Sequence, residues 1–210
     1  MLSPEAAVAF WDSRHGQQSD RSGGDLGFDE AGNSLFYSWR IGQLLQICGD
    51  MSSVRDPLDV LDAGCGKGIF ARAAAAAGHR VDAIDPSANA IAYCRERGGS
   101  ARYEKSLILD WAPPWPYDVV YSVDVLFHLL DDGIWESSLR HLASLVRLGG
   151  RLVVSDWSRE ERTQFGDYQV VRPPSAYRAV LQPLGLAAVG TVPYRFRNSP
   201  VAFHVFTRTA

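Results

Sequence analysis

The stretch LDVLDAGCGKGIFARAAAAAGHRVDAIDPS, Leu58–Ser87, decides the fold of this chain. Its first residues form a short aliphatic run, which is typical of a strand buried on both faces of a parallel sheet. Gly64, Gly66 and Gly68 follow at alternate positions and predict a tight turn that a ligand can approach without meeting a Cβ atom. The alanine-rich run Ile69–Ala77 then predicts a helix whose first amides face the turn.

A second strand, predicted over Arg80–Ile84, ends in Asp85 about 20 residues after the glycines, where a carboxylate can accept hydrogen bonds from a ribose diol. Asp62 closes the first strand. A carboxylate beside the turn repels a pyrophosphate but suits a ligand that carries an ammonium group. Ile69 also replaces the third glycine of the dinucleotide fingerprint. The unit therefore predicts a nucleoside site, with an NAD(P)-dependent oxidoreductase as a distant alternative.

The pattern D-x-G-x-G-x-G over Asp62–Gly68, followed by Asp85, resembles motif I and its follower in class I S-adenosylmethionine-dependent methyltransferases. The resemblance covers Leu58–Trp157. It implies one α/β, Rossmann-like domain whose seven-stranded, mostly parallel sheet has the order 3-2-1-4-5-7-6, an antiparallel last strand and helices on both faces. It also implies S-adenosyl-L-methionine as the cofactor and S-adenosyl-L-homocysteine as the product.

The resemblance assigns cofactor-binding residues in several parts of the chain. Those on the glycine unit and the strand ends are Asp62, Ala63, Gly64, Cys65, Gly66, Gly68, Asp85, Pro86 and Ser122. Asp110 is expected to bond the adenine amino group and Trp111 to stack on the ring; the alternative is a turn cap and a core side chain. Trp11, Tyr37 and Arg40, on helices before the unit, are expected to close over the cofactor or to meet the substrate. Ordinary packing and surface pairing are the alternatives for these three.

The strand predicted over Tyr117–Val123 leads into the candidate catalytic residues Asp124 and His128. Histidine has an ordinary pKa of about 6.5, so His128 can remove a proton from a hydroxyl acceptor near neutral pH. Asp124 lies four residues earlier, which on a helical turn would place it beside His128 as its orienting group. The alternative is that His128 is a core or capping histidine.

The segment around these residues is similar to methyltransferases of bacterial secondary metabolism and glycan modification, which implies O-methylation of a small molecule such as a secondary metabolite or sugar. N-methylation of an amine or a peptide N-terminus is the alternative, because an amine beside Asp124 needs little base catalysis. A non-catalytic binding module with the same fold is a third. Tyr37, Trp157, Tyr168 and Phe196 are expected to wall the acceptor pocket or to be scaffold.

The 210 residues, of which 46% are hydrophobic, suffice for one well-buried domain. We expect an N-terminal helical lid over residues 1–50, including the long loop from His15 to Gly32, and the catalytic domain over residues 51–210. The other expected elements are helices Ala6–Arg14, Asn33–Cys48, Ala88–Arg97, Gly133–Val146 and Ser175–Leu184, strands Ala101–Glu104, Arg151–Ser155, Leu186–Val192 and Ala202–Thr207, and an extended pocket edge over Gln169–Pro174. Ser87 is expected to cap the helix Ala88–Arg97. Asp131 or Asp132 is expected to cap the helix Gly133–Val146, and Leu148-Gly149-Gly150 to end it.

A net charge of −3 gives no basic face for nucleic acid, and no run approaches the roughly 18 apolar residues of a membrane helix. Cys48, Cys65 and Cys94 lack the spacing of a disulfide framework or a zinc site, so no metal is expected. We therefore expect a cytoplasmic monomer or homodimer that acts on a small molecule or a peptide and binds neither nucleic acid nor membrane.

Overall fold

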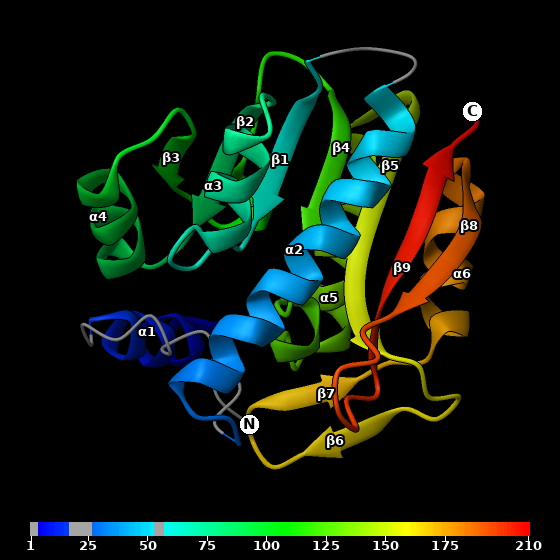
Figure 1. Ribbon diagram of the computed structural model, residues 1–210. Helices are drawn as coiled ribbons and strands as arrows, with labels where there is room; N and C mark the ends of the chain where they lie inside the picture. The colour runs from blue at the N-terminus through cyan, green and yellow to red at the C-terminus, as the bar shows by residue number, and fades with distance from the viewer. Residues whose placement is uncertain (1–3, 17–26, 53–56) are drawn as a thin grey trace.

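The computed structural model describes residues 4–16, 27–52 and 57–210, and within them the main sheet has seven strands in the order β3-β2-β1-β4-β5-β9-β8 (Figure 1). The strands are β1 Asp59–Ala63, β2 Arg80–Asp85, β3 Arg102–Lys105, β4 Tyr117–Ser122, β5 Val146–Trp157, β8 Leu186–Pro193 and β9 Val201–Arg208. β1 to β5 pair in parallel, whereas β9 runs antiparallel to both β5 and β8. This confirms the expected fold, with β8 and β9 as its sixth and seventh strands.

Helices cover both faces of this sheet, as expected. The described α-helices are α1 Pro4–His15, α2 Glu30–Ser52, α3 Ile69–Ala76, α4 Ala88–Arg97, α5 Asp132–Ser144 and α6 Pro174–Leu181, and all but α1 pack on the sheet. α2, α3 and α4 pack on one face, where α2 crosses the sheet diagonally, and α5 and α6 pack on the other (Figure 1). The expected starts are largely observed: Ser87 caps α4 by accepting a bond from the Ala90 amide, and Asp131 caps α5 in the same way.

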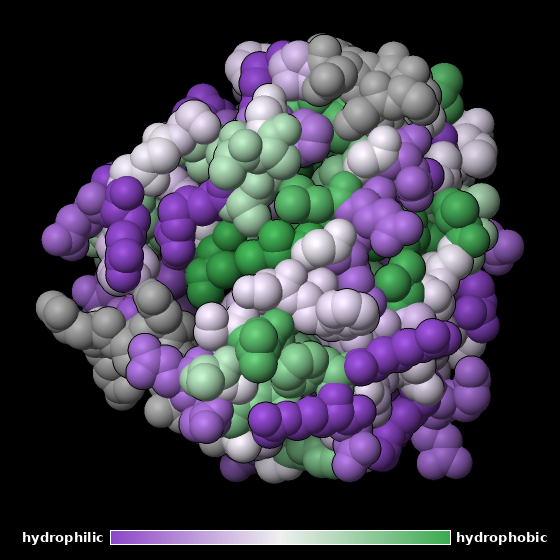
Figure 2. All heavy atoms as spheres, in the orientation of Figure 1, coloured by the Kyte–Doolittle hydropathy of each residue, from purple (hydrophilic) through white to green (hydrophobic). Residues whose placement is uncertain are grey.

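Two hydrophobic clusters form the core, one on each face of the sheet. Successive residues of β1 alternate between them: Val60 belongs to the cluster under α2 and α3, and Leu61 to the cluster under α5 and α6. On the α2 face, hydrophobic side chains also reach the surface near the middle of the molecule, surrounded by hydrophilic ones (Figure 2). Leu35 and Trp39 of α2 are among the exposed hydrophobic residues.

Two features differ from the sequence prediction. Thr163–Phe165 (β6) and Gln169–Val171 (β7) pair as a separate antiparallel hairpin, where only an extended edge was expected. The strand expected at Arg151 begins at Val146, because Val146 already pairs with Tyr117. The glycine pair that was expected to end the preceding helix instead lies inside β5, where Gly149 has a left-handed φ of 79° and the pairing with β4 shifts its register.

α1 lies against the start of α4 rather than against the sheet. Asp12 accepts hydrogen bonds from the Ser87 hydroxyl and from the Asn89 amide, at 2.7 and 3.0 Å. Most of the loop that was expected to form a lid, residues 17–26, lies outside the described residues. None of the described helices combines the length and the apolar character needed to cross a membrane.

Candidate active site

The glycine turn joins β1 to α3 at the carboxyl edge of the sheet. Gly64, Gly66 and Gly68 all have left-handed φ angles, of 86°, 50° and 70°. The amides of Gly64 and Cys65 both donate to the carbonyl of Ile84 on β2, at 2.8 and 2.9 Å, so the turn closes onto the next strand. These glycines are required by conformation, because L side chains rarely adopt such φ angles.

Close packing adds a second requirement at two of these positions. A Cβ atom on Gly64 would lie 2.3 Å from Val125 Cγ2, and one on Gly68 would lie 2.8 Å from Cys94 Sγ. At Gly66 a Cβ atom would meet only the ring of His15, at 3.4 Å. The turn therefore packs against the loop after β4 on one side and against α4 on the other.

Asp85 lies at the end of β2, directly beside this turn. Its Oδ2 accepts a bond from the Gly66 amide at 2.8 Å, and its Oδ1 accepts one from the Ser87 amide at 2.9 Å. Burial raises the pKa of Asp85 despite these two donors. Because each carboxylate oxygen has more than one lone pair, the group can still accept bonds from a pair of hydroxyls. That is the chemistry a ribose diol requires.

Asp62, at the end of β1, is 1% exposed, and its Oδ2 has no hydrogen-bond partner within the part of the chain that the structure describes. Burial and the neighbouring charge of Asp85 raise the pKa of Asp62 to about 8. The Tyr121 side chain and the Ala71 amide stabilise the carboxylate only in part, and a cation beside the unpartnered Oδ2 would lower the cost of burying the charge. The residues present thus fit a nucleoside that carries a cationic tail.

The smaller predicted residues hold this corner together. The Ala63 carbonyl accepts a bond from Ser122 Oγ at 2.8 Å, which ties the ends of β1 and β4. The Cys65 side chain is buried, and Pro86 is half-buried between Asp85 and the capping Ser87. Because the Ser122 hydroxyl donates its proton to the hydrogen bond with the Ala63 carbonyl, it cannot donate a hydrogen bond to a ligand at the same time.

α1 lies over the glycine turn and reaches the loop after β4. Trp11 packs its ring 4.7 Å from the His128 ring, and His15 is buried against Gly66. Burial, with help from Lys67 and Arg14, lowers the pKa of His15 to about 4. α1 therefore covers the region between the turn and the end of β4.

Asp110 and Trp111 lie farther along this edge, after β3. Asp110 ends a short 3-10 helix, Ile108–Asp110, and its side chain is exposed. The Trp111 ring is half-buried, and its Nε1 donates to the Tyr117 hydroxyl at 3.2 Å. The Trp111 carbonyl also bonds the His141 ring at 2.8 Å. Trp111 is thus anchored to β4 and α5, and its position for stacking on a ligand remains a prediction.

Arg40 is buried, so the alternative that it pairs on the surface is wrong, and its contact with the cofactor or the substrate stays a prediction. It is 1% exposed, its guanidinium lies 3.8 Å from the Phe36 ring centre and 4.7 Å from that of Tyr37, and it forms an ion pair with Asp124. Tyr37 in turn lies beside Phe70 of α3. Burial raises the pKa of Tyr37 to about 12, so its hydroxyl stays protonated.

Asp124 follows β4 and has a left-handed φ of 58°, which is unusual for a residue with a side chain. Its backbone amide donates to Ser155 Oγ at 2.6 Å, and its Oδ1 accepts from Ser155 and Tyr194, at 3.1 and 3.3 Å. The side chain is still 29% exposed. Strained backbone held by several partners is typical of functional positions.

His128 is not oriented by Asp124, so the expected pairing of these two side chains is wrong. Asp124 precedes the 3-10 turn Leu126–His128 instead of sharing a helical face with His128. His128 Nδ1 bonds the Tyr168 carbonyl at 2.7 Å, while the Asp124 oxygens bond other groups. Burial lowers the pKa of His128.

The residues suggested as pocket walls do not form one wall. Tyr168 stacks 6.4 Å from His128, whereas Trp157 packs on Phe165 of the hairpin. Phe196 packs on Phe36 in the core cluster under α2.

Several residues of the site were not predicted from the sequence. Ser155 could have been found, because it lies near the end of β5, beside the ends of β1 and β4 that carry Asp62 and Ser122. Lys67, which is 4% exposed and lies 4.5 Å from the Tyr93 ring centre, stands inside the glycine motif itself. Tyr194 had no local signal, since it follows β8 and reaches Asp124 only through the sheet topology.

About half of the chain is similar in sequence to known methyltransferases. The chain is 34% identical over 109 residues to the ubiquinone biosynthesis O-methyltransferase of Aeromonas salmonicida (strain A449), a match that covers 49% of this chain and 44% of that protein. It is 36% identical over 110 residues to the protein of the same name from Thiobacillus denitrificans, covering 50% of this chain and 46% of that one. The matched part is less than half of either relative.

Solved structures match over nearly the whole chain. Magnesium protoporphyrin IX methyltransferase from Synechocystis PCC 6803, with bound S-adenosylmethionine, has a TM-score of 0.72 at 18% identity, covering 96% of this chain and 97% of that one. The N-methyltransferase NodS from Bradyrhizobium japonicum WM9, with S-adenosyl-L-homocysteine, has a TM-score of 0.73 at 18% identity, covering 97% and 99%. These likenesses show the fold.

A family model described as a methyltransferase domain matches residues 38–188, which is most of the chain and contains the glycine turn, Asp85 and the loop after β4. The chain therefore belongs to the methyltransferase domain family, with the class I fold that uses S-adenosylmethionine as its cofactor.

Proposed function

We propose that this protein transfers a methyl group from S-adenosylmethionine to a hydroxyl of a small molecule, such as a secondary metabolite or a sugar. The cofactor supplies a methyl group already activated on a sulfonium. Asp85 would bind its ribose, and Asp62 would lie near its cationic amino-acid tail. The protein then has to orient the acceptor, exclude water and remove the acceptor proton.

The hydrogen bond between His128 Nδ1 and the Tyr168 carbonyl carries the proposal. A carbonyl only accepts, so Nδ1 must hold the proton of the ring. In neutral imidazole this leaves Nε2 as the bare nitrogen that can take a proton. Because burial lowers the pKa of His128, the ring is neutral at about pH 7, as a general base must be.

The charge around Asp124 favours a hydroxyl over an amine. A lone carboxylate at the end of β4 would attract an ammonium group, but Asp124 is already paired with the Arg40 guanidinium. The pair has no net charge, so it discriminates little in favour of a cation. Its partly exposed oxygens can still accept a hydrogen bond from a hydroxyl.

Among the described residues of the N-terminal region that was expected to form a lid, only α1 lies over the candidate active site. This helix covers the glycine turn and the His128 ring through His15 and Trp11. α2 instead contributes Phe36, Leu44 and Ile47 to the core cluster beneath it. We therefore propose that α1 moves to admit the cofactor, and that α2 stays with the sheet.

The experiment uses the full chain, methyl-labelled S-adenosylmethionine and separate panels of phenols, monosaccharides and primary amines. Label on a phenol or a sugar, with kcat reduced about 100-fold or more in His128→Gln and cofactor affinity unchanged, is the expected result. His79→Gln, which removes a histidine far from the end of β4, serves as the control. Label on amines alone would establish the N-methylation alternative instead.

A further inference from the structure

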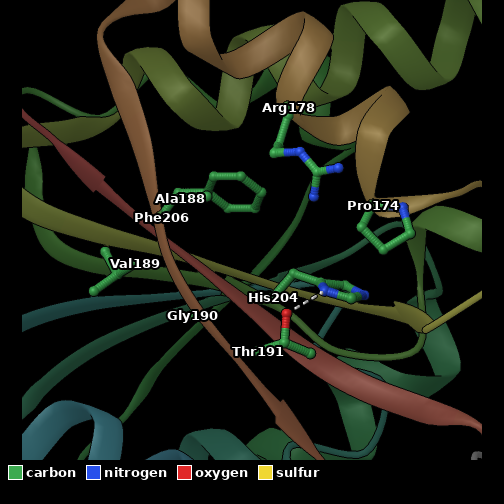
Figure 3. Close-up of a pocket in the computed structure, with 8 residues that line it drawn as sticks. All are labelled: Pro174, Arg178, Ala188, Val189, Gly190, Thr191, His204 and Phe206. Atoms are coloured by element: carbon green, nitrogen blue, oxygen red, sulfur yellow. Dashed lines mark hydrogen bonds between the residues drawn. The ribbon is translucent and has the colours of Figure 1, made fainter.

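A groove lies at the far edge of the sheet, between α6 and the strands β8 and β9 (Figure 3). Its volume is about 180 Å³. α6 contributes Pro174 and Arg178, β9 contributes His204 and Phe206, and β8 contributes the uncharged run Ala188–Thr191. None of these residues belongs to the glycine turn or to the loop after β4, so the groove is separate from the methyl-transfer site.

His204 brings an unsatisfied donor to this groove. The residue is 2% exposed, its Nδ1 lies 3.3 Å from Thr191 Oγ1, and its Nε2 is buried without a hydrogen-bond partner among the described residues. Burial lowers the pKa of His204 to about 4, so the ring is neutral and carries one proton. When the Thr191 hydroxyl donates to Nδ1, that proton lies on Nε2, and the nearby Asp156 carbonyl does not accept it in a well-formed hydrogen bond, which is costly for a buried group.

Arg178 brings a positive charge to the same space. Its side chain is exposed on α6, and no described carboxylate forms an ion pair with it. The guanidinium points from α6 toward the space beside the His204 ring (Figure 3). The two groups together offer a charged fork and one neutral N–H, which is the donor set for a single carboxylate.

The rest of the groove is apolar. Pro174 and Phe206 form walls without a charge, and Ala188 adds a small side chain beside Phe206 (Figure 3). We propose that this groove binds a small organic monocarboxylate, with its oxygens on Arg178 and His204 Nε2 and its short apolar body against Phe206 and Pro174. A phosphate dianion fits less well, because it lacks an apolar body and finds only one cation.

Butyrate is the probe, titrated into the full chain and followed by calorimetry and by the ring ¹⁵N signals of the histidines. We expect a dissociation constant on the order of 1 mM and a shift confined to the His204 ring signals. Arg178→Gln should weaken binding about tenfold or more, because it removes the charged donor. Arg140→Gln, which removes a helix-surface arginine outside the groove, is the matched control and should bind butyrate like the unmodified chain.

Two further measurements decide the matter without any assay of methyl transfer. Butyramide, which has the same shape without the charge, should bind about tenfold more weakly than butyrate. Affinity for S-adenosylhomocysteine should be the same in Arg178→Gln as in the unmodified chain. The proposal is overturned by equal binding of butyrate and butyramide, by equal butyrate binding in Arg178→Gln, or by no movement of the His204 signals.

Discussion

The guanidinium of Arg40 forms an ion pair with the carboxylate of Asp124 across 84 positions of the sequence. Arg40 is almost fully buried between the rings of Phe36 and Tyr37, while Asp124 is 29% exposed. The pair therefore fastens α2 to the strained residue that follows β4. It also sets the charge of the end of β4 that the proposed acceptor would meet.

Removing Arg40 should destabilise the fold. Arg40→Met leaves the Asp124 carboxylate without its counter-ion, and we expect the free energy of unfolding to fall by about 3 kcal/mol. Arg80→Met, which breaks the exposed pair with Asp59, should leave the stability almost unchanged, because water screens an exposed ion pair. Urea unfolding measures both. Adding Asp124→Asn to Arg40→Met should recover part of the loss; no recovery would mean that the ion pair is not the cause.

Replacing Asp85 should weaken cofactor binding without unfolding the chain. Asp85→Asn keeps the shape but removes the charge and one acceptor oxygen, so affinity for S-adenosylhomocysteine should fall about 10- to 100-fold in calorimetry. Asp59→Asn, at the opposite end of β1, is the control and should leave the affinity unchanged. An Asp85→Asn variant that binds as tightly as the unmodified chain would contradict the assignment of Asp85 to the ribose.

Cofactor binding should release a proton at about pH 7. Burial and the charge of Asp85 raise the pKa of Asp62 to about 8, so the ligand-free protein holds a proton there. A cationic tail beside Asp62 favours the carboxylate and lowers its pKa, which expels up to about one proton. Affinity should therefore rise with pH until about pH 8 and then level off.

Calorimetry in phosphate and in Tris detects this proton, because the two buffers differ in their heat of ionisation. The binding heats should differ between the buffers for the unmodified chain and coincide for Asp62→Asn. Equal heats for the unmodified chain would show that Asp62 does not change its protonation on binding.

A pair of glycine variants separates packing from backbone strain. Gly98→Ala places a side chain in open space at a φ of 69° and a ψ of −157°, a conformation that is essentially restricted to glycine, and should cost about 2 kcal/mol of unfolding free energy. Gly64→Ala adds an overlap of its Cβ atom with Val125 and should cost about 3 kcal/mol. Thermal or urea unfolding compares them. Val125→Ala in the Gly64→Ala background should restore stability; failure to do so would contradict the role of this contact.

Much of the fold could be predicted from the sequence because its signals are local. The strand, the glycine turn and the alanine-rich helix lie within Leu58–Ser87, and the Ser87 cap predicted the start of α4. The β6–β7 hairpin was missed because its strands have three residues each, too few to show an alternating pattern. The glycines at 149 and 150 were misread as a helix end because a bulge in a strand uses the same residue type.

The candidate site was predictable only where parallel strands end. Asp62, Asp85 and Asp124 follow this rule and lie at one edge of the sheet. Apart from Ser155, the side chains that hold Asp124 were not predictable. Arg40 is charged, and charged side chains are seldom buried, so nothing in the sequence indicated a place for it in the interior. The carbonyl that orients His128 belongs to Tyr168, which lies 40 positions away in the sequence.

The position of β9 has a consequence for how the chain is made. Among the described strands, β8 pairs only with β9. β9 follows β8 in the sequence, so it is synthesised later. Until the ribosome has released residues 201–208, β8 has nothing to pair with, and β5 presents an open edge. The nascent chain must therefore keep the exposed edges of β5 and β8 from wrong partners until β9 has emerged from the ribosome.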